Sequence, residues 1–156
     1  MIPSRADRLK HAEDYIKAWN AGDREGFKKS WSNVAKGAIY MYDPVGTELK
    51  HSENAVEYLA HAFDIFSKQL KMTMIIVKVN GNEIAWVIEN RYADNPVTHS
   101  IEVLRWDEDG TLHVKTYYDM PESVGVNDDP YKHTLEKHKN AEQLAELNSF
   151  EQRKKS

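Results

Sequence analysis

The chain has 156 residues, which suits one domain large enough to bury a core of its own. Hydrophobic residues make up 40% of it and charged residues 29%, a balance typical of a folded globular protein rather than a disordered one. The net charge of -4 argues against electrostatic binding of nucleic acid, and the absence of cysteine excludes disulfides, thiolate metal sites and cysteine nucleophiles. No segment is apolar for long enough to span a membrane, and the N-terminus has no signal-peptide core, so we expect a cytoplasmic protein.

Two helices are predicted at the start of the chain. Between residues 6 and 20, apolar side chains recur every three or four positions, and Tyr15 lies at the edge of the face they form. Gly22 is expected to end this helix, because glycine readily adopts the left-handed conformation of a C-terminal cap. Asp23 can then cap a shorter helix that includes Trp31.

A short strand and a third helix follow. The strand is expected over residues 38–43, so it ends on Asp43. Ser52 is expected to cap the helix, whose apolar stripe again steps by three and four and consists of Val56, Leu59, Phe63, Phe66 and Leu70.

The next part of the chain has the composition of β-strands. Turn sequences that contain Gly81, Pro96 and Gly110 separate the apolar runs, which predicts an antiparallel meander. Residues 1–121 are therefore expected to form one domain, and residues 122–156 a C-terminal extension that is mostly helical. The expected strands cover residues 72–79, 83–92, 98–106 and 111–119.

This order of elements predicts an α+β fold in which three helices cover one face of a curved, mostly antiparallel sheet. In the third strand of the meander, Ile101 faces one way, whereas Glu102, Leu104 and Trp106 face the other. Both faces are largely apolar, so both need cover. We expect the helices to cover one face and a second subunit, in a homodimer, to cover the other. The C-terminal helix is the alternative cover for that second face.

Three residues with acidic or phenolic side chains are candidates for a functional site. Asp43 precedes Pro44 and Gly46, so a rigid turn would hold its carboxylate at the mouth of the strand, where it can act as a base. Glu102 lies among apolar neighbours, where desolvation would favour its neutral form as a proton donor. Tyr15 offers a phenol from the inner edge of the first helix.

Together these residues carry a resemblance to a known family. The segments 15–23, 43–46 and 101–110 resemble the bacterial Δ5-3-ketosteroid isomerases, which belong to the nuclear transport factor 2-like (SnoaL-like) superfamily. The similarity spans roughly residues 8–120, with the elements in matching order. It implies a cone of curved sheet wrapped by three helices around a deep pocket, in a protein that is usually dimeric.

The resemblance also implies a chemistry that needs no cofactor and no metal. Asp43 would abstract a proton α to a carbonyl of a small or polycyclic hydrophobic compound, and Tyr15 with a protonated Glu102 would hold the oxyanion. The family has an aspartic acid where this chain has Glu102, which is longer by one methylene. The residues expected to line the substrate pocket are Trp19, Trp31, Leu59, Phe63, Trp86, Leu104, Trp106 and Asp119.

Two other functions remain open at this stage. In SnoaL-type polyketide cyclases an acid on the last strand is the base, and Asp119 would take that role here. Other members of the superfamily are small-molecule-binding modules without demonstrated catalysis. A metal site is not indicated, because no metal-binding spacing connects the seven histidines, which are His11, His51, His61, His99, His113, His133 and His138.

Overall fold

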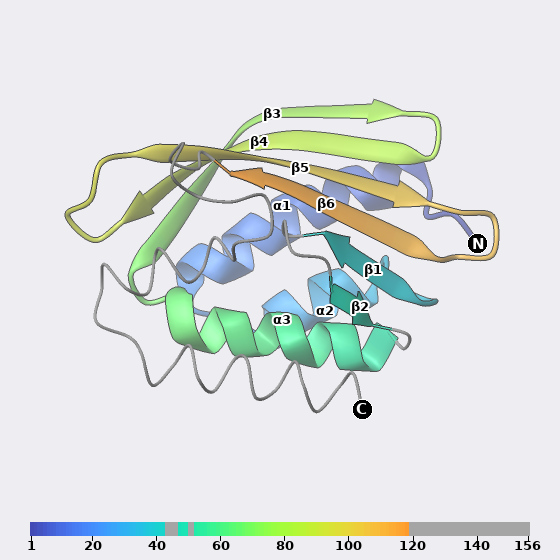
Figure 1. The fold of residues 1–156 in the computed structure, drawn as a ribbon, viewed down its shortest axis with the longest axis horizontal. Coiled ribbons are helices and arrows are strands. Elements are labelled where there is room, and N and C mark those ends of the chain that lie inside the picture. Colours follow the sequence, from blue (N-terminus) through green and yellow to red (C-terminus); the bar gives the residue numbers. More distant parts are fainter. Residues whose placement is uncertain (43–46, 50–51, 119–156) are drawn as a thin grey trace.

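The structure, a computed structural model, describes residues 1–42, 47–49 and 52–118 (Figure 1). Among these residues, no helix is both long and apolar enough to cross a lipid bilayer. The predicted α+β class is confirmed. The described elements are α1 (Arg5–Ala21), α2 (Arg24–Ser32), β1 (Ile39–Tyr42), β2 (Thr47–Leu49), α3 (Ser52–Phe66), β3 (Leu70–Asn80), β4 (Glu83–Tyr92), β5 (Thr98–Trp106) and β6 (Leu112–Tyr118).

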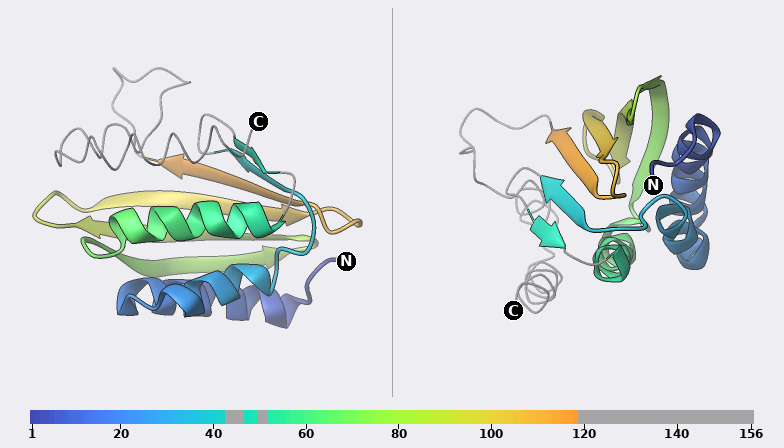
Figure 2. Two further views of the ribbon diagram at one scale, coloured as in Figure 1. Left: turned by 90° about the horizontal axis from the view of Figure 1, so that it is seen from below. Right: turned by 90° about the vertical axis from the view of Figure 1, so that its right-hand side faces the viewer.

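The described strands form one mixed sheet in the order β2-β1-β6-β5-β4-β3. The strands from β3 to β6 form the predicted antiparallel meander, and β1 extends it by pairing in parallel with β6. The sheet curves, and the helices lie along one side of it, as the two views of Figure 2 show. α1 packs against β3, α2 lies against α1, and α3 lies against α2.

Local signals account for most element boundaries, with two corrections. A capping box at Ser4 begins α1, and Gly22 ends it in the left-handed conformation, with φ of 68°. Leu70, which we expected on the third helix, instead opens β3, because α3 ends at Phe66 and Leu70 pairs with Tyr92 on β4. The strand β2 was not expected, since three residues are too few to show a strand period.

Hydrogen bonds fix both ends of α1 to the β3–β4 hairpin. Near the start of the helix, Nη1 of Arg8 donates to two backbone oxygens at the β3–β4 turn, at 2.8 and 2.9 Å. Near its end, the side-chain amide of Asn20 donates to the oxygen of Met72 (2.7 Å) and accepts from its N–H (2.9 Å). Because these contacts set the rotation of α1 about its axis, they also set where Tyr15 points.

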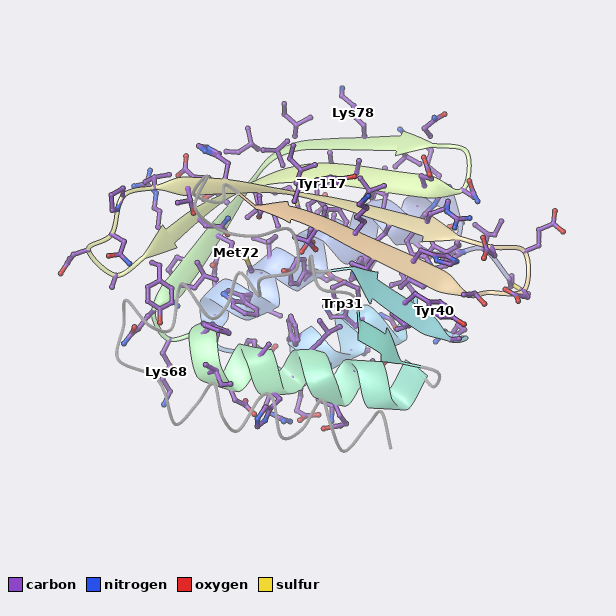
Figure 3. The ribbon with its side chains drawn as sticks, in the orientation of Figure 1. Trp31, Tyr40, Lys68, Met72, Lys78 and Tyr117 are labelled. Carbon is purple, nitrogen blue, oxygen red and sulfur yellow. The ribbon has the colours of Figure 1, made fainter. Side chains whose placement is uncertain are left out.

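The side chains of β5 alternate between the two faces as predicted. Leu104 and Trp106 are fully buried on the helix side, whereas Ile101 on the outer face is 45% exposed. Figure 3 shows the same division, with Trp31 between the sheet and the helices and Lys78 pointing away from them. The largest fully buried side chains are Trp31, Trp86, Trp106, Phe27, Ile39, Ile84, Ile88, Leu104 and Leu112.

The outer face of the sheet carries a row of apolar side chains. Ile76 pairs with Val87, Val87 with Ile101, and Ile101 with Tyr117, so the row crosses β3, β4, β5 and β6 without a break. Ile76, Ile101 and Tyr117 are each nearly half exposed. These four residues are called the outer row below.

Candidate functional site

Tyr15 lies inside a buried group of rings. Its side chain is only 7% exposed, and its ring centroid lies 5.6 Å from that of Trp31 and 6.1 Å from that of Trp86. Its hydroxyl lies 3.9 Å from the sulfur of Met72 on β3, within reach of a weak O–H···S hydrogen bond. The aromatic cluster consists of His11, Tyr15, Trp19, Phe27, Trp31, Phe63 and Trp86.

Glu102 joins the aromatic cluster through Trp86. The two residues are directly opposite each other on β4 and β5, and Nε1 of Trp86 donates a 2.8 Å hydrogen bond to Oε2 of Glu102. Glu102 is half-buried, whereas Leu104 and Trp106 on the same face are fully buried. The structure therefore brings Tyr15 and Glu102 to the same indole, which orients the carboxyl group.

His11 also belongs to the aromatic cluster, and it was not predicted as a site residue. It lies one helical turn before Tyr15, and the two rings stack at 6.0 Å. Its Nδ1 lies 2.9 Å from the backbone oxygen of Ser30, which can only accept, so Nδ1 carries a proton. Burial lowers the pKa of His11 to about 4, so the ring is neutral near pH 7. The spacing of four residues from Tyr15 is the signal that could have revealed it.

The four tryptophans differ in the partners of their indole N–H groups. Trp19 and Trp106 donate to backbone oxygens at 2.8 and 2.9 Å, and Trp86 donates to Glu102. Nε1 of Trp31 is buried and has no acceptor among the residues that the structure describes. Trp31 is therefore the exception, because the indole N–H groups of the other three tryptophans all have a hydrogen-bond acceptor.

The remaining residues expected to line a pocket are in three situations. Phe63 belongs to the aromatic cluster, and its ring lies 5.4 Å from that of Trp19. Leu59 packs against the core, and Leu104 is fully buried within it. Asp43 and Asp119 lie outside the described residues, so their roles as bases stay predictions.

A second polar group lies on the outer face of the sheet. Asp107 Oδ2 lies 2.8 Å from Nε2 of His113, and its Oδ1 lies 2.5 Å from Nη1 of Arg105. The hydrogen bond with His113 and the charge of Arg105 hold the pKa of Asp107 below its ordinary value. This group faces away from the aromatic cluster. In the described part of the chain, no three His, Asp or Glu side chains gather in a way that could hold a metal ion.

No protein-family model and no curated protein sequence matches the chain. Solved structures do match it over nearly their whole length. A protein proposed to be an isomerase of the SnoaL-like family from Agrobacterium tumefaciens is 16% identical, with a TM-score of 0.54, over 74% of this chain and 99% of that one. A protein proposed to be a SnoaL-like polyketide cyclase from Jannaschia sp. CCS1 is 11% identical, with a TM-score of 0.54, over 76% of this chain and 91% of that one.

A third similar structure is Rv0760c from Mycobacterium tuberculosis, solved in complex with estradiol-17β-hemisuccinate. It is 16% identical, with a TM-score of 0.51, over 73% of this chain and 95% of that one. The chain has the nuclear transport factor 2-like fold. The fold predicted from the sequence is thereby confirmed, whereas the narrower resemblance to ketosteroid isomerases stays a prediction. The nuclear transport factor 2-like fold supports many chemistries, so the function has to be argued from the side chains.

Proposed function

We propose that this protein is a cofactor-independent, isomerase-like enzyme that abstracts a proton α to a carbonyl of a small or polycyclic hydrophobic substrate. The observation that supports this proposal most strongly is the placement of Tyr15 and Glu102 against Trp86 in the buried aromatic cluster. Two oxygen-borne donors in a water-poor, aromatic setting are suited to stabilising negative charge on an oxygen.

The proposed reaction moves one proton and leaves the substrate's composition unchanged. The Asp43 carboxylate takes the proton from the α carbon of a β,γ-unsaturated carbonyl compound, and the electron pair of the broken C–H bond is delocalised onto the carbonyl oxygen as a dienolate, whose γ carbon can accept a proton. Hydrogen bonds from the Tyr15 hydroxyl and the neutral Glu102 carboxyl stabilise that oxyanion. Asp43 then returns the proton at another carbon, which restores both the base and the carbonyl.

A second candidate is a cyclase of the SnoaL type that uses Asp119 as its base. The likeness to the proposed polyketide cyclase from Jannaschia favours keeping it. A non-catalytic binding module is the third candidate, and the steroid conjugate bound by Rv0760c illustrates such binding in this fold.

Substitution of the base distinguishes these candidates. Asp43→Asn keeps the shape and hydrogen bonding of the side chain but removes the base, so turnover should fall by about 10²–10⁴-fold while binding of 2-naphthol, an enolate-like phenol, persists. The first substrate to test is a Δ5-3-ketosteroid, whose conjugated product is followed by absorbance. Activity that survives Asp43→Asn and disappears in Asp119→Asn would establish the cyclase-type base instead. Turnover absent on all carbonyl substrates, with 2-naphthol still bound, would establish a binding module.

We also propose that the protein is a homodimer whose subunits meet through the outer row. Ile76, Ile101 and Tyr117 are nearly half exposed. With Val87 between Ile76 and Ile101, they form a continuous row on a face that the described helices leave uncovered. Burial of such a continuous apolar strip against a second copy would remove it from water.

A further inference from the structure

Two polar atoms in the aromatic cluster are buried without a partner among the described residues. They are Nε2 of His11 and Nε1 of Trp31, and both side chains are only 2% exposed. The two rings contact each other edge to face, with their centroids 4.7 Å apart. Buried polar atoms are nearly always hydrogen-bonded to protein or to ordered water, so two such atoms on contacting side chains indicate that a partner, a ligand group or a water, completes them.

The chemistry of the pair defines what that group must be. Because Nδ1 of His11 donates to the Ser30 oxygen, Nε2 carries the lone pair and can only accept. The indole nitrogen of Trp31 can only donate. A single group that serves both atoms must therefore donate one hydrogen bond and accept another, as a hydroxyl or a water molecule does. A ketone or a carboxylate could satisfy Trp31 but would leave His11 without a donor.

The position of the pair connects it with the proposed site. The centroid of the Tyr15 ring lies 6.0 Å from that of the His11 ring and 5.6 Å from that of the Trp31 ring. The centroid of the His11 ring also lies 5.8 Å from that of Trp86, the indole that donates a hydrogen bond to Glu102. The pair and the two proposed oxyanion donors thus belong to one cluster of contacting rings.

We propose that His11 and Trp31 form a hydroxyl-recognition subsite. A hydroxyl of the bound substrate donates to Nε2 of His11 and accepts from Nε1–H of Trp31. The substrate class is therefore a hydrophobic carbonyl compound that also carries a hydroxyl group. This inference rests on the proposed function, since it places the hydroxyl on the same ligand whose carbonyl meets Tyr15 and Glu102.

The test compares probes that differ only in a second hydroxyl. Dissociation constants are measured by calorimetry for 2-naphthol, 2,6-dihydroxynaphthalene and 2,7-dihydroxynaphthalene. The better diol is the one whose second hydroxyl reaches both His11 and Trp31. It should bind about tenfold more tightly than 2-naphthol, because that hydroxyl gains two hydrogen bonds. That gain should vanish in Trp31→Phe and in His11→Phe. It should persist in the control Tyr40→Phe, which removes one hydroxyl from a half-buried ring that stacks on His113, outside the aromatic cluster.

A second measurement covers the case in which His11→Phe does not fold. The indole N–H signals of the wild-type protein are recorded by NMR, and Trp31→Phe assigns the signal of Trp31. The better diol should shift that signal, whereas 2-naphthol should leave it in place.

The outcomes separate this subsite from the proposed function. If 2-naphthol binds but neither diol gains affinity, or if the gain survives in both Trp31→Phe and His11→Phe, the subsite is wrong and the proposed pocket stands. A Trp31 signal that no diol moves would show that no diol hydroxyl reaches this indole and would overturn the subsite too. If no probe binds, the subsite and the proposed pocket fail together.

Discussion

Trp31 and Trp106 offer a matched pair of substitutions. Both indoles are almost completely buried, and replacement of either by phenylalanine removes the same ring atoms. Only Trp106 has a protein acceptor for its N–H, the backbone oxygen of Val34. Trp106→Phe should therefore lower the free energy of unfolding by about 1–2 kcal/mol more than Trp31→Phe, because it alone leaves a buried carbonyl without its donor. Denaturant unfolding of the two variants measures the difference, and equal losses would contradict the assignment of Trp31 as unpartnered.

The buried imidazole of His11 should make stability depend on pH. Burial lowers its pKa from 6.5 to about 4, so below pH 6.5 the unfolded chain binds a proton that the folded chain does not. The contribution of this group is thus fully present above pH 6.5 and is lost as the pH falls towards 4, at ~1.4 kcal/mol per pH unit and about 3 kcal/mol in all.

His11→Gln provides the comparison for that prediction. Glutamine can still donate a hydrogen bond to the Ser30 oxygen but does not titrate, so the difference in unfolding free energy between wild type and variant should shrink as the pH falls from 6.5 to 4. Carboxylates elsewhere affect both proteins alike. Parallel pH profiles would show that His11 takes up its proton at the same pH in the folded and the unfolded chain, so that burial does not lower its pKa.

The sequence predicted where two of the candidate site residues lie, because their cues are local. The helical period placed Tyr15 on the buried face, and strand alternation placed Glu102 on the same side as Leu104 and Trp106. The hydrogen bond from Trp86 to Glu102 was not predictable, since it depends on the register between β4 and β5. Asp43 cannot be compared in this way, because it lies outside the described residues.

The helix α1 carries Tyr15 and depends on β3 for its orientation. Asn20 makes two hydrogen bonds to the backbone of Met72, on a strand at the edge of the sheet. Asn20→Ala should lower the free energy of unfolding by about 1–3 kcal/mol, because it leaves a donor and an acceptor of a well-buried residue without partners. Chemical denaturation measures this loss.

The exposed Asn33, which follows α2, provides the control for that substitution. Asn33→Ala should change stability by less than about 0.5 kcal/mol, as surface substitutions usually do. A small effect of Asn20→Ala, similar to that of Asn33→Ala, would show that the Met72 backbone finds other partners and that α1 is oriented by packing alone.

The elements differ in how well their sequences predicted them. The antiparallel hairpins were predictable because turn residues such as Gly81 lie between two adjacent strands. The parallel pairing of β1 with β6 joins segments about 70 residues apart, so no local signal reports it. Leu70 fits the apolar spacing of α3, but the helix has already ended at Phe66. Leu70 is the first residue of β3, because strand pairing with β4 outweighs the local helical pattern.

The outer row is the feature of the fold that most needs an explanation. Helices cover the inner side of the sheet, whereas Ile101 and its neighbours on the outer side are exposed to solvent in the described chain. A strip of apolar residues across four strands favours contact with another surface. If that surface is a second copy, a charge placed in the row should separate the subunits.

Ile101→Lys is the substitution that tests this contact. Ile101 lies between Val87 and Tyr117 in the row. A lysine there would face the outer row of the second subunit, and its ammonium group would have to lose its hydration when the dimer forms. Light scattering at micromolar concentration should show a dimer for the wild type and a monomer for Ile101→Lys. Val97→Lys provides the matched control, because Val97 is also exposed but lies in the β4–β5 connection rather than in the row, and this variant should stay dimeric.

The C-terminal extension is the other segment that could cover the outer row. If it covers the row, the full chain should be a monomer and a chain shortened after Pro121 should associate, which is the opposite of what a dimer through the outer row requires.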